Sequence, residues 1–136
     1  MGENIFIKCK NCSFHKEYDT GVGMMFGDIE FIFNLLEKKE KFEAERIYRE
    51  YKSTLNYESD GYVLYQCPKC SSVRNKCHLE LNKNNKKIFE TKSICSYCSI
   101  ERVKLPIFAN QTYIKNFKCP KCKSGNYDCF GGMLWD

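Results

Sequence analysis

The sequence has no apolar run long enough to cross a membrane, and its first residues lack the apolar region of a secretory signal. A membrane-spanning helix needs a stretch of about eighteen or more apolar residues, and none occurs. Phe6 also stands where a myristoylation signal needs Ser or Thr. These absences predict a cytoplasmic protein in a reducing compartment, where cysteines are rarely joined in disulfides.

Arginine is scarce: the chain has four arginines against eighteen lysines. The net charge is +5, and it is unevenly placed, with −3 over residues 28–60 and +10 over residues 61–125. A basic half suggests an anionic partner. However, a divalent metal ion together with four thiolates has a net charge of about −2. Two such complexes would bring the whole chain to about +1. Because Arg is the commonest reader of guanine, the composition argues against sequence-specific binding to nucleic acid.

Cysteine, by contrast, is abundant, with ten in 136 residues. Eight of them form four Cys-x-x-Cys pairs: Cys9 and Cys12, Cys67 and Cys70, Cys95 and Cys98, Cys119 and Cys122. Two such pairs separated by twenty residues, as in the last two, have the spacing of a four-thiolate zinc site. The sequence therefore predicts two Zn²⁺ ions per chain, bound by these eight cysteines.

Two groupings of the four pairs compete. In the sequential grouping the first two pairs form site 1 and the last two form site 2; in the nested grouping the two central pairs share one ion and the outer pairs share the other. A hairpin expected around Asn84 would bring Cys70 and Cys95 together, which favours nesting. The order Cys-x-x-Cys-Ser before Cys-Pro-Lys-Cys occurs twice, which favours the sequential grouping. We predict the sequential grouping on the strength of this repeat.

The remaining segments predict short strands and a helical insertion. Residues 28–55 have apolar positions at helical spacing, with Asp28 as the cap and a bend near residues 38–41. Strands are expected over two ranges before this insertion and five after it: residues 5–7, 14–18, 62–65, 73–81, 88–94, 103–108 and 113–118. The closing Met-Leu-Trp is expected to be a packed tail.

The predicted fold class is a small, metal-stabilised α+β protein. It would contain two zinc ribbons made of short antiparallel hairpins, with about two helices inserted in the first. Residues 1–81 would form the first ribbon with its insertion at about 28–55, and residues 82–136 the second. The two ribbons would pack together as one compact unit, because neither has much core of its own.

Four further residues have side chains that can bind a metal ion: Cys77, Cys129, His15 and His78. Together with the paired cysteines they would suffice for three tetrahedral sites, but buried free thiols are common and inert. Cys77 and His78 could be a nucleophile and its base. Adjacent residues of a strand point to opposite faces, however, so no catalytic set is expected and the chain is predicted not to be an enzyme.

The order of motifs resembles that of small uncharacterised bacterial proteins with two four-cysteine zinc ribbons, of the type found in low-GC Gram-positive bacteria. The shared features are the first pair followed by Gly21-Val-Gly23-Met-Met-Phe, a helical insertion, Cys67-Pro-Lys-Cys70, two later pairs, and the closing Met133-Leu-Trp-Asp136. The resemblance implies two zinc ribbons and no assigned activity. Ser13, Ser71 and Ser99 stand where many ribbons have glycine.

Three functions are consistent with these patterns. The first is a binding module in which zinc is structural and an unknown protein is the favoured partner, because a closed four-sulfur shell leaves no position for substrate. A variant of it binds nucleic acid through Lys83, Lys86, Lys87 and Lys92, with Phe89, Tyr97, Phe108 and Tyr113 available for stacking. The second is a rubredoxin-like iron electron carrier, and the third a thiol redox protein. No membrane contact and no small-molecule substrate is evident.

Overall fold

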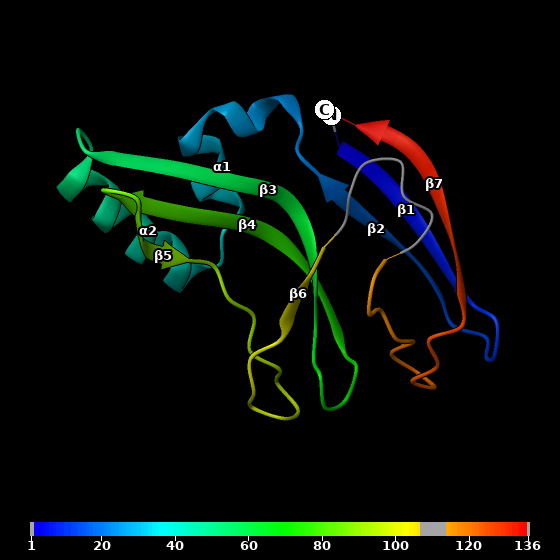
Figure 1. Cartoon of the computed structure of the whole chain (residues 1–136). Coiled ribbons are helices and arrows are strands. Elements are labelled where there is room, and N and C mark those ends of the chain that lie inside the picture. Colours follow the sequence, from blue (N-terminus) through cyan, green and yellow to red (C-terminus); the bar gives the residue numbers. More distant parts are fainter. Residues whose placement is uncertain (1, 107–113, 136) are drawn as a thin grey trace.

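The computed structural model describes residues 2–106 and 114–135, and a seven-stranded antiparallel sheet runs through them (Figure 1). The strand order is β5-β4-β3-β2-β1-β7, and β6 pairs with β3 beside this path. The strands are β1 (Gly2–Cys9), β2 (His15–Gly21), β3 (Leu55–Gln66), β4 (Val73–Lys83), β5 (Lys86–Glu90), β6 (Val103–Leu105) and β7 (Tyr127–Trp135). The protein is thus mostly antiparallel sheet with two helices, a larger sheet than two separate hairpins would form.

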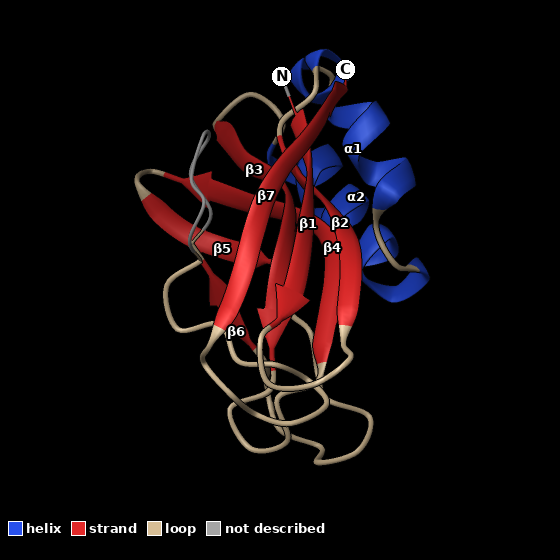
Figure 2. Ribbon diagram, turned by 90° about the vertical axis from the view of Figure 1, so that its right-hand side faces the viewer, coloured by secondary structure: helices blue, strands red, loops and turns tan. Residues whose placement is uncertain are grey.

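Two helices, α1 (Ile29–Leu35) and α2 (Lys38–Tyr51), lie on one side of the sheet (Figure 2). The predicted cap is confirmed, since the Asp28 side chain accepts a hydrogen bond from the Glu30 N–H at 3.0 Å. The break between the helices falls at residues 36–37, slightly earlier than predicted. Leu55, assigned to the helical region from its spacing, is instead the first residue of β3.

The helices cover an apolar core that they share with β4 and β5. Phe33 and Ile32 from α1, with Ala44 and Ile47 from α2, are buried together with alternate β4 residues. The β4 members are Cys77, Leu79 and Leu81. Because successive side chains of a strand point to opposite faces, these three lie on the face of β4 that the helices cover. The apolar stripe of each helix is buried against them.

A second core lies under β1, β2 and β7, closer to the cysteine turns. Ile5 and Ile7 of β1 pack with Tyr18 of β2, Leu64 of β3 and Cys129 of β7. The segment that follows the gap in the described residues also contributes, through the buried Ile114 and Phe117. This core therefore joins strands from both ends of the chain.

The strand predictions before residue 88 are largely confirmed, the one over residues 88–94 is observed only as far as Glu90, and the two later ones also differ. The strand expected over residues 103–108 is observed as far as Leu105, and its last two residues lie outside the described part. The strand expected over residues 113–118 is wrong for residues 114–118, which form a turn and irregular chain, and Tyr113 lies outside the described part. The closing residues, predicted as a packed tail, instead complete a long strand, β7, that pairs with β1.

β7 determines how the two ends of the chain meet. It runs antiparallel to β1 from the Cys9↔Tyr127 pair to the Gly2↔Trp135 pair. Trp135 packs edge-on against Tyr62 at 5.5 Å between ring centroids, which anchors the end of the strand on the helix-covered core. The division at residues 81 and 82 remains a prediction, but β4 runs across it and the sheet joins strands of both halves.

Candidate metal centres

The four Cys-x-x-Cys pairs lie in turns at one end of the molecule, where the strands end (Figures 1 and 2). The first pair lies in the turn between β1 and β2, and the second in the turn between β3 and β4. The third pair precedes β6 and the fourth precedes β7. The β1–β7 and β3–β6 pairings each place two of these turns side by side.

The outer pairs form one group of four sulfurs, which we call site A. It consists of Cys9, Cys12, Cys119 and Cys122. The Sγ atoms of Cys9 and Cys122 lie 3.6 Å apart, and those of Cys12 and Cys119 lie 3.5 Å apart. Four sulfurs about 2.3 Å from a central ion at tetrahedral angles lie about 3.8 Å from one another, so this spacing suits a single ion. The cysteines are free thiols, not disulfides.

The central pairs form a second group, which we call site B. It consists of Cys67, Cys70, Cys95 and Cys98. The Sγ atoms of Cys70 and Cys95 lie 3.6 Å apart, the same spacing as in site A. The two groups could therefore hold two metal ions, and all eight cysteines predicted as ligands are brought together in them.

The sequential grouping of the pairs is wrong, and the nested grouping is the one that the structure has. The reason lies in the strand pairing. Because β7 pairs with β1, the turn before β7 lies beside the turn after β1. Because β6 pairs with β3, from Gln66↔Val103 onward, the turn before β6 lies beside the turn after β3. The repeated Cys-Pro-Lys-Cys motif belongs to two different sites.

Three of the turns share one backbone geometry. The Cys67 N–H donates to the Ser72 carbonyl and the Ser71 N–H donates to the Cys67 carbonyl, each at 2.9 Å. Cys95 and Cys119 begin turns with the same two hydrogen bonds. The fifth residue of each turn has a positive φ, for example 64° at Ser71 and 59° at Ser99. This explains why glycine would suit these positions, since it reaches that region without strain.

Backbone N–H groups in the turns point at the sulfurs. The Asn11 N–H lies 3.3 Å from Cys9 Sγ, and the Lys121 N–H lies 3.4 Å from Cys119 Sγ. Such donors stabilise a thiolate, which is the form that binds metal. The arrangement is therefore suited to negatively charged sulfurs around a cation.

The thiols of site B differ strongly in acidity. A hydrogen bond from the Ser72 hydroxyl is the main cause that lowers the pKa of Cys95 to about 6. Burial, followed by the neighbouring cysteines, raises the pKa of Cys98 to about 12. Four sulfurs at this spacing cannot all ionise without a cation among them, so the site needs a metal ion to become fully deprotonated.

Cys77 and Cys129 are buried free thiols, as predicted, and they lie in the two apolar cores. Burial raises the pKa of Cys77 to about 12, so it is unsuited to nucleophilic chemistry. His15 is exposed and lies against the Phe6 ring, at 6.1 Å between centroids. These residues join neither site A nor site B.

A third group of metal-ligand types contains His78, Glu80 and Glu90. It already surrounds a cation, because the Lys87 ammonium forms ion pairs with both carboxylates. The Asp60 N–H donates to His78 Nδ1 at 3.1 Å, which places the ring proton of the neutral imidazole on Nε2, the nitrogen that faces Glu90. With the Lys87 ammonium paired to both of its carboxylates, this group is an ion-pair network.

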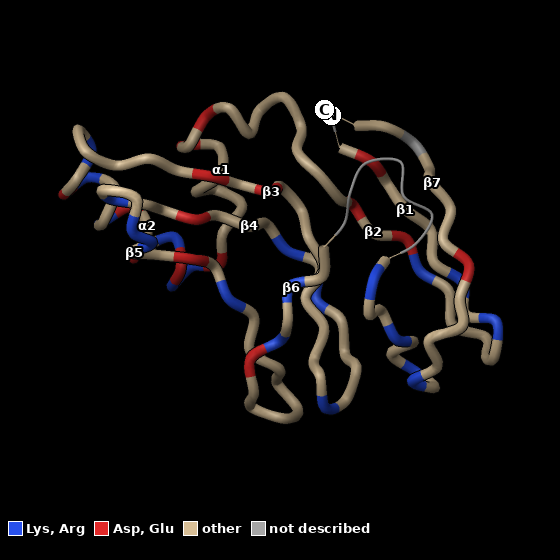
Figure 3. The backbone as a smooth tube through the Cα atoms, in the orientation of Figure 1, with Lys and Arg blue, Asp and Glu red and all other residues tan. Residues whose placement is uncertain are grey.

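The lysines considered for nucleic-acid binding are partly engaged with the protein itself. Lys83 lies 3.9 Å from the centre of the Tyr51 ring, and Lys87 pairs with the two glutamates named above. Lys86 is exposed on β5, and Lys92 follows that strand. Acidic residues lie among the basic ones over α2, β4 and β5 (Figure 3), so the positions of these lysines are not surrounded by positive charge alone. Phe89, considered for stacking, is buried, and Phe108 and Tyr113 lie outside the described residues.

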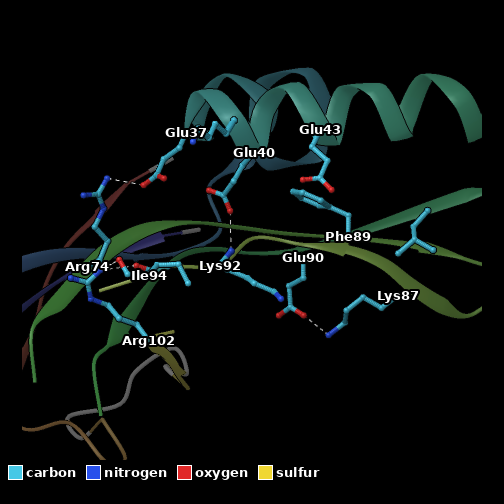
Figure 4. Close-up of a pocket in the computed structure, with 13 residues that line it drawn as sticks. Glu37, Glu40, Glu43, Arg74, Lys87, Phe89, Glu90, Lys92, Ile94 and Arg102 are labelled. Carbon is cyan, nitrogen blue, oxygen red and sulfur yellow. Dashed lines mark hydrogen bonds and ion pairs between the residues drawn. The ribbon is translucent and has the colours of Figure 1, made fainter. Parts of the chain in front are cut away.

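The turn of site B carries exposed apolar side chains. Tyr97, at its tip, is 83% exposed, and Ile94 and Ile100 on either side are also exposed. Ile94 lines one end of a groove of about 880 Å³ between α2 and β5 (Figure 4).

Gln66 joins the two sites. It directly precedes Cys67, and its side-chain amide donates to the carbonyls of Ser71 at 2.9 Å and Lys118 at 2.6 Å. Its Oε1 accepts the Lys118 N–H at 3.0 Å, and Lys118 directly precedes Cys119. The buried amide thus holds a turn of site B against a turn of site A. No sequence pattern indicated this residue.

Replacing Gln66 with Leu is expected to lower the free energy of unfolding of the metal-loaded protein by about 2–3 kcal/mol. The variant keeps the bulk of the side chain but leaves buried carbonyl and N–H groups unpaired. Asn11→Ala is the matched control, because it also removes a side-chain amide bond in the turns, to Ser124, but an exposed one. Urea unfolding at fixed zinc concentration measures both, and equal effects of the two variants would contradict this role for Gln66.

The comparisons with known proteins give no relative. No family model matches the chain, no curated protein matches it, and no solved structure matches it. Among the described residues, no helix is both long and apolar enough to cross a membrane. What the chain does must therefore be argued from its own residues.

Proposed function

We propose that this chain is a structural zinc protein, with one Zn²⁺ in site A and one in site B, that acts by binding another protein rather than by catalysis. The observation that carries the proposal is the pair of closed four-sulfur groups, at sulfur separations of 3.5–3.6 Å. Four thiolates fill the tetrahedral shell of zinc and leave no position for water or substrate. Each site then serves to hold two turns together.

The proposal extends to the architecture of the sites. Each would be a zinc ribbon in which one hairpin turn and the turn before a third strand supply two cysteines each. The ribbon of site B would be inserted within that of site A. Membership of the small bacterial proteins with two four-cysteine ribbons, and a cytoplasmic location, are part of the same proposal and are supported by the motif order and by ten unpaired thiols.

The exposed Tyr97 and its flanking isoleucines support a protein as the partner, in the role of an adaptor. Nucleic acid is less well supported, because the lysines of the β4–β5 hairpin are partly paired with glutamates. A rubredoxin-like iron site has the same donor set and the same geometry. It is therefore an outcome that the measurement of metal identity must distinguish.

Native mass spectrometry with elemental analysis is expected to find two zinc ions per chain. Two double variants then separate the groupings of cysteines. Cys9→Ser/Cys119→Ser damages site A alone and should leave one ion, whereas Cys9→Ser/Cys67→Ser damages both sites and should leave none. A grouping by sequence order would give the reverse results, because Cys9 and Cys67 would then share a site.

Other metal contents would contradict specific parts of the proposal. Iron with the visible absorption of a ferric thiolate would favour electron transfer. An aerobically purified chain with no metal and with disulfides within the Cys-x-x-Cys pairs would favour thiol redox chemistry.

A further inference from the structure

Arg102 is a buried cation next to site B. It lies between the turn of the third cysteine pair and β6, and it is 9% exposed. One terminal nitrogen, Nη1, donates to Ser93 Oγ at 2.9 Å and to the Ile94 carbonyl at 3.1 Å. The other, Nη2, donates to Ser72 Oγ at 3.1 Å. In Figure 4 the side chain lies beside Ile94, at the opposite end of the groove from Lys87.

The charge of Arg102 has no carboxylate partner within residues 2–106 and 114–135. The Nε atom is also buried without a hydrogen bond there. A buried cation is costly unless a negative charge lies nearby. The set of four thiolates of site B, which carries a net charge of about −2 once a divalent metal is bound, can supply it.

Ser72 connects the guanidinium to these thiolates. Its Oγ lies 3.3 Å from the Sγ of Cys70 and 3.3 Å from the Sγ of Cys95. Because the hydroxyl accepts an N–H from Arg102 on its oxygen, its own proton is free to be donated to a sulfur. A hydroxyl polarised by a cation is a stronger donor than one without it. Two hydrogen bonds therefore connect the guanidinium to one of these two sulfurs, since a hydroxyl has a single proton to donate.

Site A has a neutral counterpart at the equivalent position. Ser124 follows Cys119 as Ser72 follows Cys67, five residues later, and its Oγ accepts a hydrogen bond at 2.7 Å from the exposed Asn11 amide. An amide supplies a donor without a charge. Ser124 Oγ also accepts the Asn126 N–H at 3.0 Å, and within the described residues it has no hydrogen bond to a sulfur. The two sites are thus alike in sulfur geometry, but they differ in that a serine held by a cation contacts the sulfurs of site B.

We propose that Arg102, acting through Ser72, is a positioning residue specific to site B, which retains the metal ion there and has no effect on site A. The proposal rests on the metal binding proposed above. The guanidinium holds the Ser72 hydroxyl toward Cys70 and Cys95 and offsets the negative charge of their metal complex. Groups that orient metal ligands in this way typically change metal affinity by about 10–100-fold.

The test measures zinc release from each site separately. Zinc-loaded protein is mixed with a chromophoric chelator, and samples taken over time are alkylated and analysed by peptide mass spectrometry, which reports the cysteines of site A and site B individually. Arg102→Met keeps the length of the side chain without its charge, and Ser72→Ala removes the link. Asn11→Ala is the matched control at site A, and Arg74→Met, an exposed arginine paired with Glu37, controls for the loss of a charge.

We expect Arg102→Met to release zinc from site B at least about tenfold faster than the unaltered protein, with the rate at site A unchanged. Ser72→Ala should do the same, and the double variant should be no faster than either single one, since both remove one path. Arg102→Lys should recover part of the effect because it restores the charge. The d–d spectrum of Co²⁺-loaded protein should change for Arg102→Met and not for Asn11→Ala or Arg74→Met.

Three results would overturn the inference: an unchanged rate at site B, equal acceleration at both sites, or additive effects of the two variants. Should Arg102→Met fail to fold, Ser72→Ala alone decides, because a missing hydroxyl leaves the cores intact. Failure of the proposed function looks different, since the unaltered protein would then contain no zinc at all.

Discussion

Removal of both metal ions with a chelator is expected to unfold the chain at room temperature. A structural zinc site contributes roughly 10–16 kcal/mol of apparent binding energy that becomes folding energy, whereas a domain of ordinary size is stable by only about 5–15 kcal/mol. Without the ions, four turns would hold thiols 3.5–3.6 Å apart with nothing between them. Far-UV circular dichroism before and after chelation measures the loss of sheet.

The control for this experiment is restoration. Adding Zn²⁺ under reducing conditions should recover the spectrum, and adding Mg²⁺ should not, because thiolates do not suit Mg²⁺. Acid should act as the chelator does. Metal binding releases protons from the thiols, so the folded protein holds fewer protons than the unfolded chain, and stability falls as the pH falls. An unaltered melting temperature after complete metal removal would show that the two apolar cores suffice by themselves.

The sequence identified the metal-ligand candidates correctly but did not predict which of them share a site. Cys-x-x-Cys spacing is local, so it identified all eight cysteines that the structure brings together. Which cysteines share a site depends on which strands pair. The decisive pairing, of β7 with β1, joins segments that are more than a hundred residues apart in the sequence. The residues 127–135 contain Gly131 and Gly132, which weaken any strand pattern. Reading this stretch as a strand antiparallel to β1 would have predicted the nested grouping.

The supporting residues around the sites were missed for a similar reason. Gln66, Ser72 and Arg102 act through contacts between segments, and polar residues of these types are common on any surface. One signal was available for Ser72: a serine stands five residues after the first cysteine in both Cys-Pro-Lys-Cys turns, at Ser72 and Ser124. The helices were predicted more closely, since a cap at Asp28 and the buried Ile47 and Phe33 follow from local periodicity.

A buried ion pair between α2 and β4 holds the helices on the sheet, and its loss should destabilise the protein strongly. Glu40 Oε1 lies 2.5 Å from the Lys76 ammonium, whose side chain is 7% exposed, and Glu40 Oε2 accepts the Lys92 N–H at 2.9 Å. Lys76 also donates to the Lys92 carbonyl at 2.6 Å. Figure 4 shows Glu40 pointing from the helix toward Lys92. One carboxylate therefore links the helix to β4 and to the segment after β5.

Glu40→Ala is expected to lower the free energy of unfolding by about 3 kcal/mol, because it leaves the ammonium of Lys76 buried without its nearest anion. Glu37, the other carboxylate near Lys76, is farther away at 3.8 Å and half exposed, so it compensates weakly. Glu43→Ala is the matched control: it lies one turn along α2, lines the same groove, and is exposed. Its effect should stay within about 0.5 kcal/mol, as for other surface substitutions.

Two further variants distinguish the charge from the shape of Glu40. Glu40→Gln keeps a carbonyl that can accept from Lys76 and should lose less stability than Glu40→Ala. The double variant Glu40→Leu/Lys76→Met replaces the pair by apolar side chains and should recover part of the loss, since a buried pair gains little over well-packed apolar residues. Recovery should be incomplete because the Lys92 N–H and carbonyl both lose their side-chain partners. Urea unfolding of the zinc-loaded variants gives all four values. If Glu40→Ala and Glu43→Ala were equally stable, the helices would be held by their apolar stripe alone, and the groove beside α2 would owe its shape to the packing of Phe33 and Ile47 on β4.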